Sequence, residues 1–292
     1  LADWLPIINR FTAKASAEIS TGHVEAQNRI FPDLANINAQ IGDFEVLGQN
    51  FNKLNLRAMP LEHVWRFDVT SEQFDGRVDF YPSWREQGLK VVADKLYLSF
   101  DSKAPSEAQF TPIEVQQGLP PLAIDVDDFR FYGKQLGHLQ MQANPSDEGY
   151  RFQTISLDHP NKKVSLRANG RWHVAEDDIN TQFDIKVHAD KFDELSDILG
   201  INPGLKDAPL DLVGQISWQN TPYHFSLETL NGNVKFDIGK GYLSEISDKG
   251  ARLFSLFSLD SIVRKLSLDF SDVFGKGLYF NSFNGNLVID NG

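Results

Sequence analysis

The side chains that could perform acid–base or metal chemistry are scattered through this sequence. No H-E-x-x-H, G-x-S-x-G or P-loop motif occurs, and no two histidines stand four residues apart, the spacing that binds a metal from one helix face. The seven histidines are His23, His63, His138, His159, His173, His188 and His224. Neighbouring carboxylates are common among 40 acidic residues, and none has a distinguishing context. We therefore predict no catalytic residue, no cofactor and no enzymatic activity.

One acidic stretch, "DVDDF" at 125–129, resembles the start of a calcium-binding loop. Such a loop requires glycine at its sixth position and glutamate at its twelfth, where this chain has Arg130 and Leu136. We interpret these carboxylates as the solvated outer side of a strand and predict no metal site.

Composition narrows the class of protein. The net charge of −12 repels phosphate backbones, so we expect no nucleic-acid partner. There is no cysteine, and no apolar run approaches the ~20 residues that span a bilayer. The chain begins at Leu1 without a signal sequence, and we expect a soluble piece of a longer polypeptide.

Alternating apolar residues predict strands that each bury one face. The alternation recurs at short intervals, and Gly, Asn, Asp and Pro separate the runs, as hairpin turns require. The runs are Ile37/Ala39/Ile41, Leu54/Leu56/Ala58, Val78/Phe80, Leu96/Leu98/Phe100, Leu139/Met141/Ala143, Val164/Leu166/Ala168, Phe183/Ile185/Val187, Leu210/Leu212, Ile216/Trp218, Phe225/Leu227, Val234/Phe236/Ile238 and Leu287/Ile289.

An internal repeat organises the first half of the chain. Residues 41–67 align without gaps to residues 126–152, with 8 identities in 27 positions. Both copies change phase at the same place, from Ile41 to Phe44 and from Val126 to Phe129, and we expect a β-bulge at each. Repetition of a multi-strand unit predicts a sheet that grows by addition.

Three segments predict helices. "KFDELSDILGINPG" carries apolar residues at helical spacing and ends at Gly200. "DWLPIINRF" near the start is a weaker candidate for a short N-terminal helix. The stretch 248–274 has a broad apolar stripe and, between 249 and 268, four basic residues against Asp260. It either packs on the end of the sheet as a cap or contacts an anionic membrane surface. The stripe comprises Leu253, Leu256, Phe257, Leu259, Ile262, Val263 and Leu266.

The predicted fold is mainly β, an elongated, curled antiparallel sheet that repeats a β-groove, with a few short helices capping its C-terminal part. A continuous apolar groove fits acyl chains, because each buried CH₂ gains ~0.8 kcal/mol. The main alternative is a closed, self-filled β domain that acts as a structural adaptor through protein contacts; a secreted hydrolase with an unrecognised site is a third. The expected groove lining is Phe44, Val46, Leu54, Leu56, Phe67, Val69, Val78, Phe80, Leu96, Leu98, Phe129, Phe131, Leu139, Met141, Phe152, Val164, Leu166, Phe183 and Ile185.

Most of the chain resembles the YhdP family of AsmA-like proteins of Gram-negative bacteria. The resemblance is carried by "GKGYL", by "GARLFSLFSLDSIVRKLSLDFSDVFGKG" and "FNGN" within 230–292, and upstream by "LGQNFNKLNLRA", "YGKQLGHLQMQA" and "ILGINPG…GQISWQ". It implies a periplasmic, bridge-like lipid-transfer protein with an inner-membrane anchor in a missing N-terminal part. Its repeated grooves would carry phospholipid toward the outer membrane, with an unknown periplasmic or outer-membrane protein as a further partner. We expect three parts: a first β repeat with a short helix (1–110), a second repeat (111–190) and a C-terminal AsmA-like portion (191–292).

Overall fold

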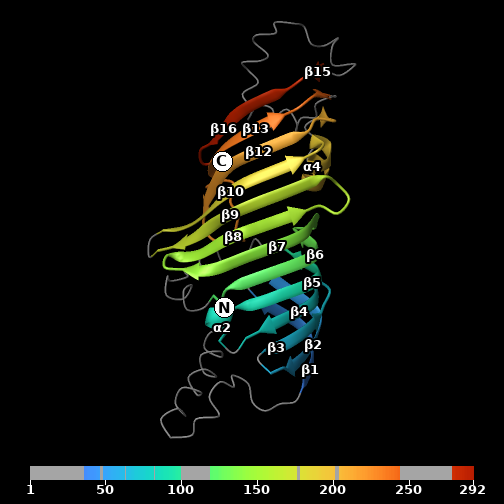
Figure 1. Cartoon of the computed structure of the whole chain (residues 1–292), viewed down its shortest axis with the longest axis vertical. Coiled ribbons are helices and arrows are strands. Elements are labelled where there is room, and N and C mark those ends of the chain that lie inside the picture. Colours follow the sequence, from blue (N-terminus) through green and yellow to red (C-terminus); the bar gives the residue numbers. More distant parts are fainter. Residues whose placement is uncertain are drawn as a thin grey trace. The chain divides into compact units, whose positions relative to one another are not determined.

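The computed structural model describes residues 36–46, 49–62, 64–81, 83–99, 119–175, 178–200, 204–243 and 278–292 (Figure 1). The predicted helix in "DWLPIINRF" and the apolar stripe from Leu253 to Leu266 lie outside these residues.

Strands make up most of the described chain, as the alternation predicts. The large sheet contains β1 (Ile37–Val46), β2 (Gln49–Pro60), β3 (Trp65–Thr70), β4 (Phe74–Phe80), β5 (Leu89–Leu98), β6 (Leu122–Phe131), β7 (Lys134–Ser146), β8 (Gly149–Asp158), β9 (Val164–Val174), β10 (Ile179–Ala189), β12 (Leu210–Gln219), β13 (Asn231–Ile238) and β16 (Phe283–Ile289), adjacent in that order. A small sheet contains β11 (Leu205–Lys206), β14 (Gly241–Leu243) and β15 (Leu278–Phe280). Two short helices are described, α2 (Trp84–Gln87) and α4 (Phe192–Leu199). Across the described strands the large sheet runs from β1 to β16 without closing into a barrel.

One strand pair departs from the predicted antiparallel arrangement. β5 and β6 are parallel, with Leu89 opposite Leu122 and Leu98 opposite Phe131. A parallel pair requires a long crossover, and residues 99–121 supply that length. β6 is also the strand at which the second copy of the repeat begins. The alternation of apolar and polar residues shows which side chains share a face of a strand, but it says nothing about the direction of the strand. The sequence pattern therefore could not predict this parallel pairing.

The chain divides into two compact units. The first contains residues 1–133, 140–151 and 174–177, and the second contains residues 134–139, 152–173 and 178–292.

In the first unit, strand pairing places apolar residues together on one side. Residues directly opposite in neighbouring strands share a face. One such row crosses five strands and consists of Leu56, Val69, Gly76, Ala93 and Val126. The adjacent row on the opposite side is charged: Arg57 lies opposite Asp68, which lies opposite Arg77. The sheet of this unit therefore has one apolar and one polar face.

The second unit repeats this two-faced pattern. Ile185, Gly214, Val234 and Leu287 lie in one row across β10, β12, β13 and β16. The neighbouring row on the same face consists of Val187, Leu212, Phe236 and Gly285. On the opposite face, His188 lies opposite Asp211, which lies opposite Asp237.

The phase change near Phe44 does not come from the expected β-bulge. β1 and β2 keep the same register on both sides of it, since Ile41 pairs with Leu54 and Asp43 with Asn52. Lys53, between those two partners, has a left-handed backbone (φ 54°), so both strands change together. In the second copy, β6 keeps one register with the preceding strand β5, from Ala93–Val126 to Lys95–Asp128. The bulge expected there, between β6 and β7 as the counterparts of β1 and β2, stays a prediction. A register shift lies between β4 and β5, at Asp75 and Gly76.

Two glycines on the apolar side mark strong local bending. A Cβ at Gly76 would lie 2.5 Å from the Cα of Ala93, and one at Gly214 would lie 2.7 Å from the Cα of Val234. Side chains crowd on the inner side of a bend, and glycines and bulges are what permit it. We infer that each unit is curled at these strands with its apolar face inward.

The predicted helix at 192–199 is confirmed as α4. Gly200 follows it in the left-handed conformation (φ 71°, ψ 31°), which ends the helix without steric cost. Phe192 and Leu195 pack on a buried cluster at one end of the apolar face, together with β11 and β15 residues. The buried members of that cluster are Ala189, Leu205, Ala208, Leu210, Phe236 and Ile238. This end of the face is filled by the protein's own side chains.

Candidate functional site

The candidate site is the apolar face of each unit, meaning the side of the strands that carries the apolar rows. The pairing register of the strands decides which side chains share this face. Because apolar residues alternate along each strand, this register brings them together on one side. Several are half-buried, including Leu56, Val78 and Ile185, and so remain partly open to solvent.

In the first unit, the pairing brings most of the expected lining residues onto this face. Ten of them share it: Leu54, Leu56, Phe67, Val69, Val78, Phe80, Leu96, Leu98, Phe129 and Phe131. Phe44 pairs with Phe51 beyond the left-handed Lys53, and both are half-buried. Val46 pairs with Gln49 through its backbone, and its side chain lies outside the described part. Met141 is half-buried on β7.

In the second unit, Phe183 and Ile185 lie on the apolar face by register. Phe152 joins them, since its ring lies 5.3 Å from that of Phe183. Val164 packs on the buried cluster beneath α4. Leu139 is buried on β7 and Leu166 is half-buried on β9.

Two pairs of equivalent residues in the two copies of the repeat are buried to the same extent. Leu54 and Leu139 are each 7% exposed, and Ala58 and Ala143 are 1% and 0% exposed. Each pair occupies the same place in the aligned segments, so at these two positions the sequence repeat is also a repeat of packing.

The charged groups of the first unit pair with one another on the opposite, polar face. Arg66 donates two hydrogen bonds to Asp79, at 2.7 and 3.0 Å, and this partner holds the pKa of Asp79 below its usual value. Tyr97 donates to Asp128 at 2.6 Å, and the guanidinium of Arg130 lies 4.5 Å from the Tyr97 ring centroid.

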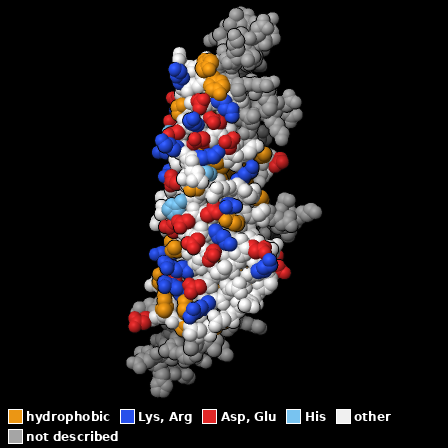
Figure 2. Space-filling model, turned by 90° about the vertical axis from the view of Figure 1, so that its right-hand side faces the viewer, with side chains coloured by type: hydrophobic (Ala, Val, Ile, Leu, Met, Phe, Trp, Pro, Cys, Tyr) orange, Lys and Arg blue, Asp and Glu red, His pale blue; other side chains and the backbone are white. Residues whose placement is uncertain are grey.

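The polar face of the second unit holds a histidine between two carboxylates. His188 contacts Asp211 at 2.7 Å and Asp190 at 3.1 Å, and these hydrogen bonds raise the pKa of the imidazole. Lys163 lies 3.0 Å from Asp190. One side of the molecule, seen in Figure 2, shows acidic and basic side chains intermingled, with hydrophobic side chains in small groups. Ion pairs of this kind are typical of a solvated surface. A ligand on the apolar face would therefore be bound through burial of apolar surface.

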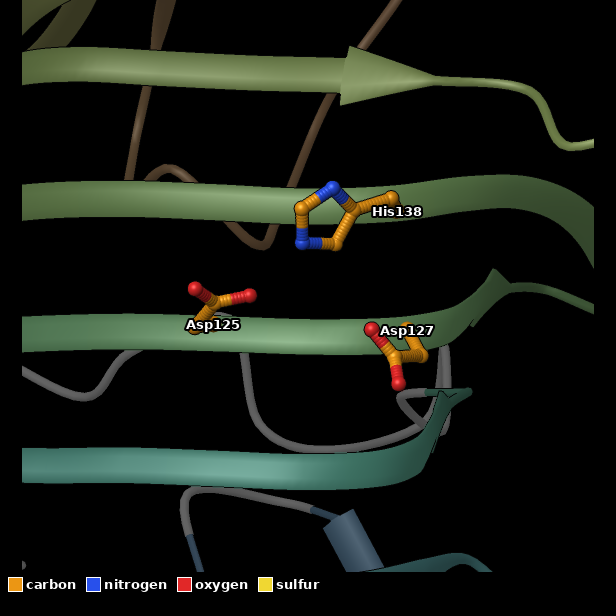
Figure 3. Close-up of side chains that lie close together, drawn as sticks. All are labelled: Asp125, Asp127 and His138. Carbon is orange, nitrogen blue, oxygen red and sulfur yellow. The ribbon is translucent and has the colours of Figure 1, made fainter.

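Three polar side chains could in principle hold a cation (Figure 3). Asp125 and Asp127 on β6 and His138 on β7 place one ligand atom each within 4.8 Å of one another. The sequence drew attention to the two aspartates but not to His138. Asp125 also accepts a hydrogen bond from the Gln140 side chain at 3.2 Å. Exposed groups of this type are common without an ion, and nothing further in the described residues points to a ligand.

One predicted strand, Phe225/Leu227, is wrong. Phe225 and Leu227 do not belong to a strand; they lie in the loop 221–230 between β12 and β13. The ring of Phe225 packs on that of Trp218 at 5.3 Å. This tertiary contact determines where Phe225 lies, so its two-residue spacing from Leu227 carries no information about a face.

No helix in the described part of the chain is long and apolar enough to cross a bilayer.

Comparisons with known proteins point in one direction. The family model described as "YhdP protein" matches residues 1–292. Among curated proteins, the chain is 27% identical over 177 residues to the "Intermembrane phospholipid transporter YhdP" of Escherichia coli (strain K12). The match covers 60% of this chain and 14% of that relative, so the chain corresponds to a small part of the relative's length. No solved structure matches the chain significantly. With its whole length matched by the family model, this two-faced β protein belongs to the YhdP family.

Proposed function

We propose that this chain is a segment of a periplasmic, bridge-like lipid-transfer protein whose apolar face shields phospholipid acyl chains between the inner and outer membranes. The single observation that carries the proposal is the set of apolar rows on one face of neighbouring strands, with ion pairs on the other face. The name of the matched relative, an intermembrane phospholipid transporter, supports the substrate class.

The energetics suit transport by shielding. A ~16-carbon acyl chain gains on the order of 12 kcal/mol when it leaves water for an apolar surface. A lipid crossing an aqueous space faces a barrier of that order, and a continuous apolar face removes most of it. The process requires no catalytic residue, no cofactor and no metal, and it would contribute to outer-membrane lipid homeostasis.

The proposal includes the setting of the chain. The parent protein would be anchored in the inner membrane and would reach the outer membrane at its far end, with a periplasmic or outer-membrane protein as a further partner. The segment 249–268 would cap the apolar face or contact the bilayer there; it lies outside the described residues, and binding of the isolated segment to anionic liposomes separates the two roles.

A second candidate function is a closed structural adaptor. It is favoured by one observation, the buried cluster under α4, where the protein fills its own apolar face. Away from that cluster, residues such as Ile185, Ile216 and Leu287 remain half-buried, which favours an apolar face that is open to lipid.

Lipid extraction and native mass spectrometry of the purified chain test the proposal. We expect co-purifying phospholipid in defined mass increments. A protein free of phospholipid, which also fails to take it up from vesicles, would support the adaptor.

A further inference from the structure

Four aromatic rings form a continuous row in the second unit. We call Phe152, Phe183, Trp218 and Phe225 the aromatic row. Successive ring centroids lie 5.3, 5.7 and 5.3 Å apart. The row starts on β8, passes through β10 and β12, and ends in the loop 221–230. The first three residues are 6–9% exposed, whereas Phe225 is 50% exposed. The row therefore leads from the interior of the apolar face to solvent.

Gly170 on β9 keeps the row continuous. A Cβ at this position would lie 2.4 Å from Cδ1 of Phe183 and 2.2 Å from the backbone oxygen of Gln182. The Phe183 ring thus occupies the space that any other residue at 170 would fill. Glycine in a strand interior is a place where another group approaches closely, and here that group is a member of the row.

The loop that carries Phe225 is fixed at both ends. Trp218 donates its indole N–H to the Thr221 carbonyl at 3.0 Å, and the Thr181 hydroxyl donates to the Asn220 carbonyl at 2.8 Å. At the other end, the Gly292 amide donates to the Leu230 carbonyl at 3.0 Å. Phe225 and Leu227 are nevertheless exposed by 50% and 63%. Because hydrogen bonds hold both ends of the loop, the fold itself keeps these two side chains exposed.

The exposed side chains of Phe225 and Leu227, which we call the tip of the loop, determine what kind of ligand could cover them. Two exposed apolar side chains in one loop offer no hydrogen-bond partner to a polar ligand, and covering them with an apolar group is what gains free energy. Because Phe225 packs edge-on against buried Trp218, whatever covers the tip is continuous with the apolar face.

We propose that Phe225 and Leu227 form the point at which a phospholipid acyl chain enters or leaves the apolar face of the second unit, and that the buried rings of the aromatic row hold Phe225 at this point. The inference rests on the proposed function and adds a specific place of entry to it.

Site-specific photocrosslinking tests the inference. A photoreactive phenylalanine analogue is introduced singly at Phe225, Leu227, Ile185 and Val288 of the purified chain, which is then illuminated with vesicles of phosphatidylethanolamine and phosphatidylglycerol. Val288 is a matched control, because it is 68% exposed in the same unit but lies opposite Asn233 on the polar face. Ile185 reports on the apolar face itself. We expect lipid adducts at Phe225, Leu227 and Ile185 at about tenfold the yield at Val288, the ratio expected from about 1.4 kcal/mol of added apolar contact.

The outcomes separate the two proposals. An adduct at Ile185 without one at Phe225 or Leu227 leaves the proposed function standing and overturns the entry point. Equal yields at Phe225 and Val288 also overturn it, because the contact is then unspecific. No adduct at any of the four sites defeats both.

A kinetic measurement distinguishes an entry point from a merely structural loop. The double variant F225A/L227A should take up phospholipid about tenfold more slowly, with the amount bound at saturation unchanged and V288A as control. A reduced amount at saturation together with a lower unfolding midpoint would show that the two residues only support the fold.

Discussion

The most informative perturbation places a charge in the middle of the apolar face. Ile185 on β10 is half-buried on the apolar face and lies opposite Gly214. In the variant I185D, the new carboxylate retains its water, because dehydrating a charge is far costlier than losing apolar contact. An acyl chain on this face would then lose contact for about four methylenes. At ~0.8 kcal/mol for each CH₂, the loss is about 3 kcal/mol, or roughly a hundredfold in affinity.

The chain provides a matched control for this change. Val213 is 50% exposed on the polar face of the same unit, where it lies opposite Lys186 and Lys235. In V213D an equally large apolar-to-acidic change falls between two basic residues, and it should leave lipid binding unaltered. Binding is measured by titrating each purified variant with a phospholipid that carries a fluorescent acyl chain. Circular dichroism and the urea midpoint establish the folded fraction. Equal affinities for I185D and V213D would refute the assignment of the acyl chain to this face.

Three further predictions concern stability and are measured by urea unfolding. G214V should lower the free energy of unfolding by more than about 2 kcal/mol, because its Cβ would lie 2.5 Å from the Asn233 carbonyl oxygen. The control G42A has nothing within 4 Å of its Cβ and should change that free energy by less than about 0.5 kcal/mol. Equal effects of the two variants would contradict the bend at Gly214. Y150F should cost about 1–3 kcal/mol, since the buried hydroxyl donates to the Pro120 carbonyl at 2.7 Å; an unchanged midpoint would show that this bond is not formed. His188 has a raised pKa, so its contribution is fully present below the unfolded pKa and is lost as pH rises through the folded pKa. The wild type should therefore lose up to about 1 kcal/mol more than H188Q between about pH 5.5 and 8.5, a small effect because the pair is exposed, and identical pH profiles would count against the His188 contacts.

The sequence predicted the strands of this protein well, because a sheet with one buried face imposes period-two alternation on each strand. In the second unit the pairing of Ile185 with Gly214, and in the first unit that of Leu56 with Val69, places the predicted residues on the apolar face of that unit's own sheet. Helix α4 was also predictable, since its apolar spacing and Gly200 are local signals.

The features that escaped prediction depend on contacts between distant residues. The parallel pairing of β5 with β6 is a matter of chain direction, to which alternation is blind. Phe225 alternates with Leu227, as in a strand, but its ring packs on Trp218 from a loop. Gly170 and Gly214 appear in the sequence as isolated glycines inside strands; only the neighbouring backbone shows that a side chain there would collide. His138 could not be associated with Asp125 and Asp127 before the strands were aligned.

In the function proposed above, the apolar face holds acyl chains and is not filled by the protein itself. The most direct test of this function is an experimental structure of the chain determined after incubation with phospholipid. We expect elongated acyl-chain density along the apolar face of the second unit, over Ile185 and Gly214. Protein side chains filling that space, with lipid absent or on the polar face beside Val213, would contradict it.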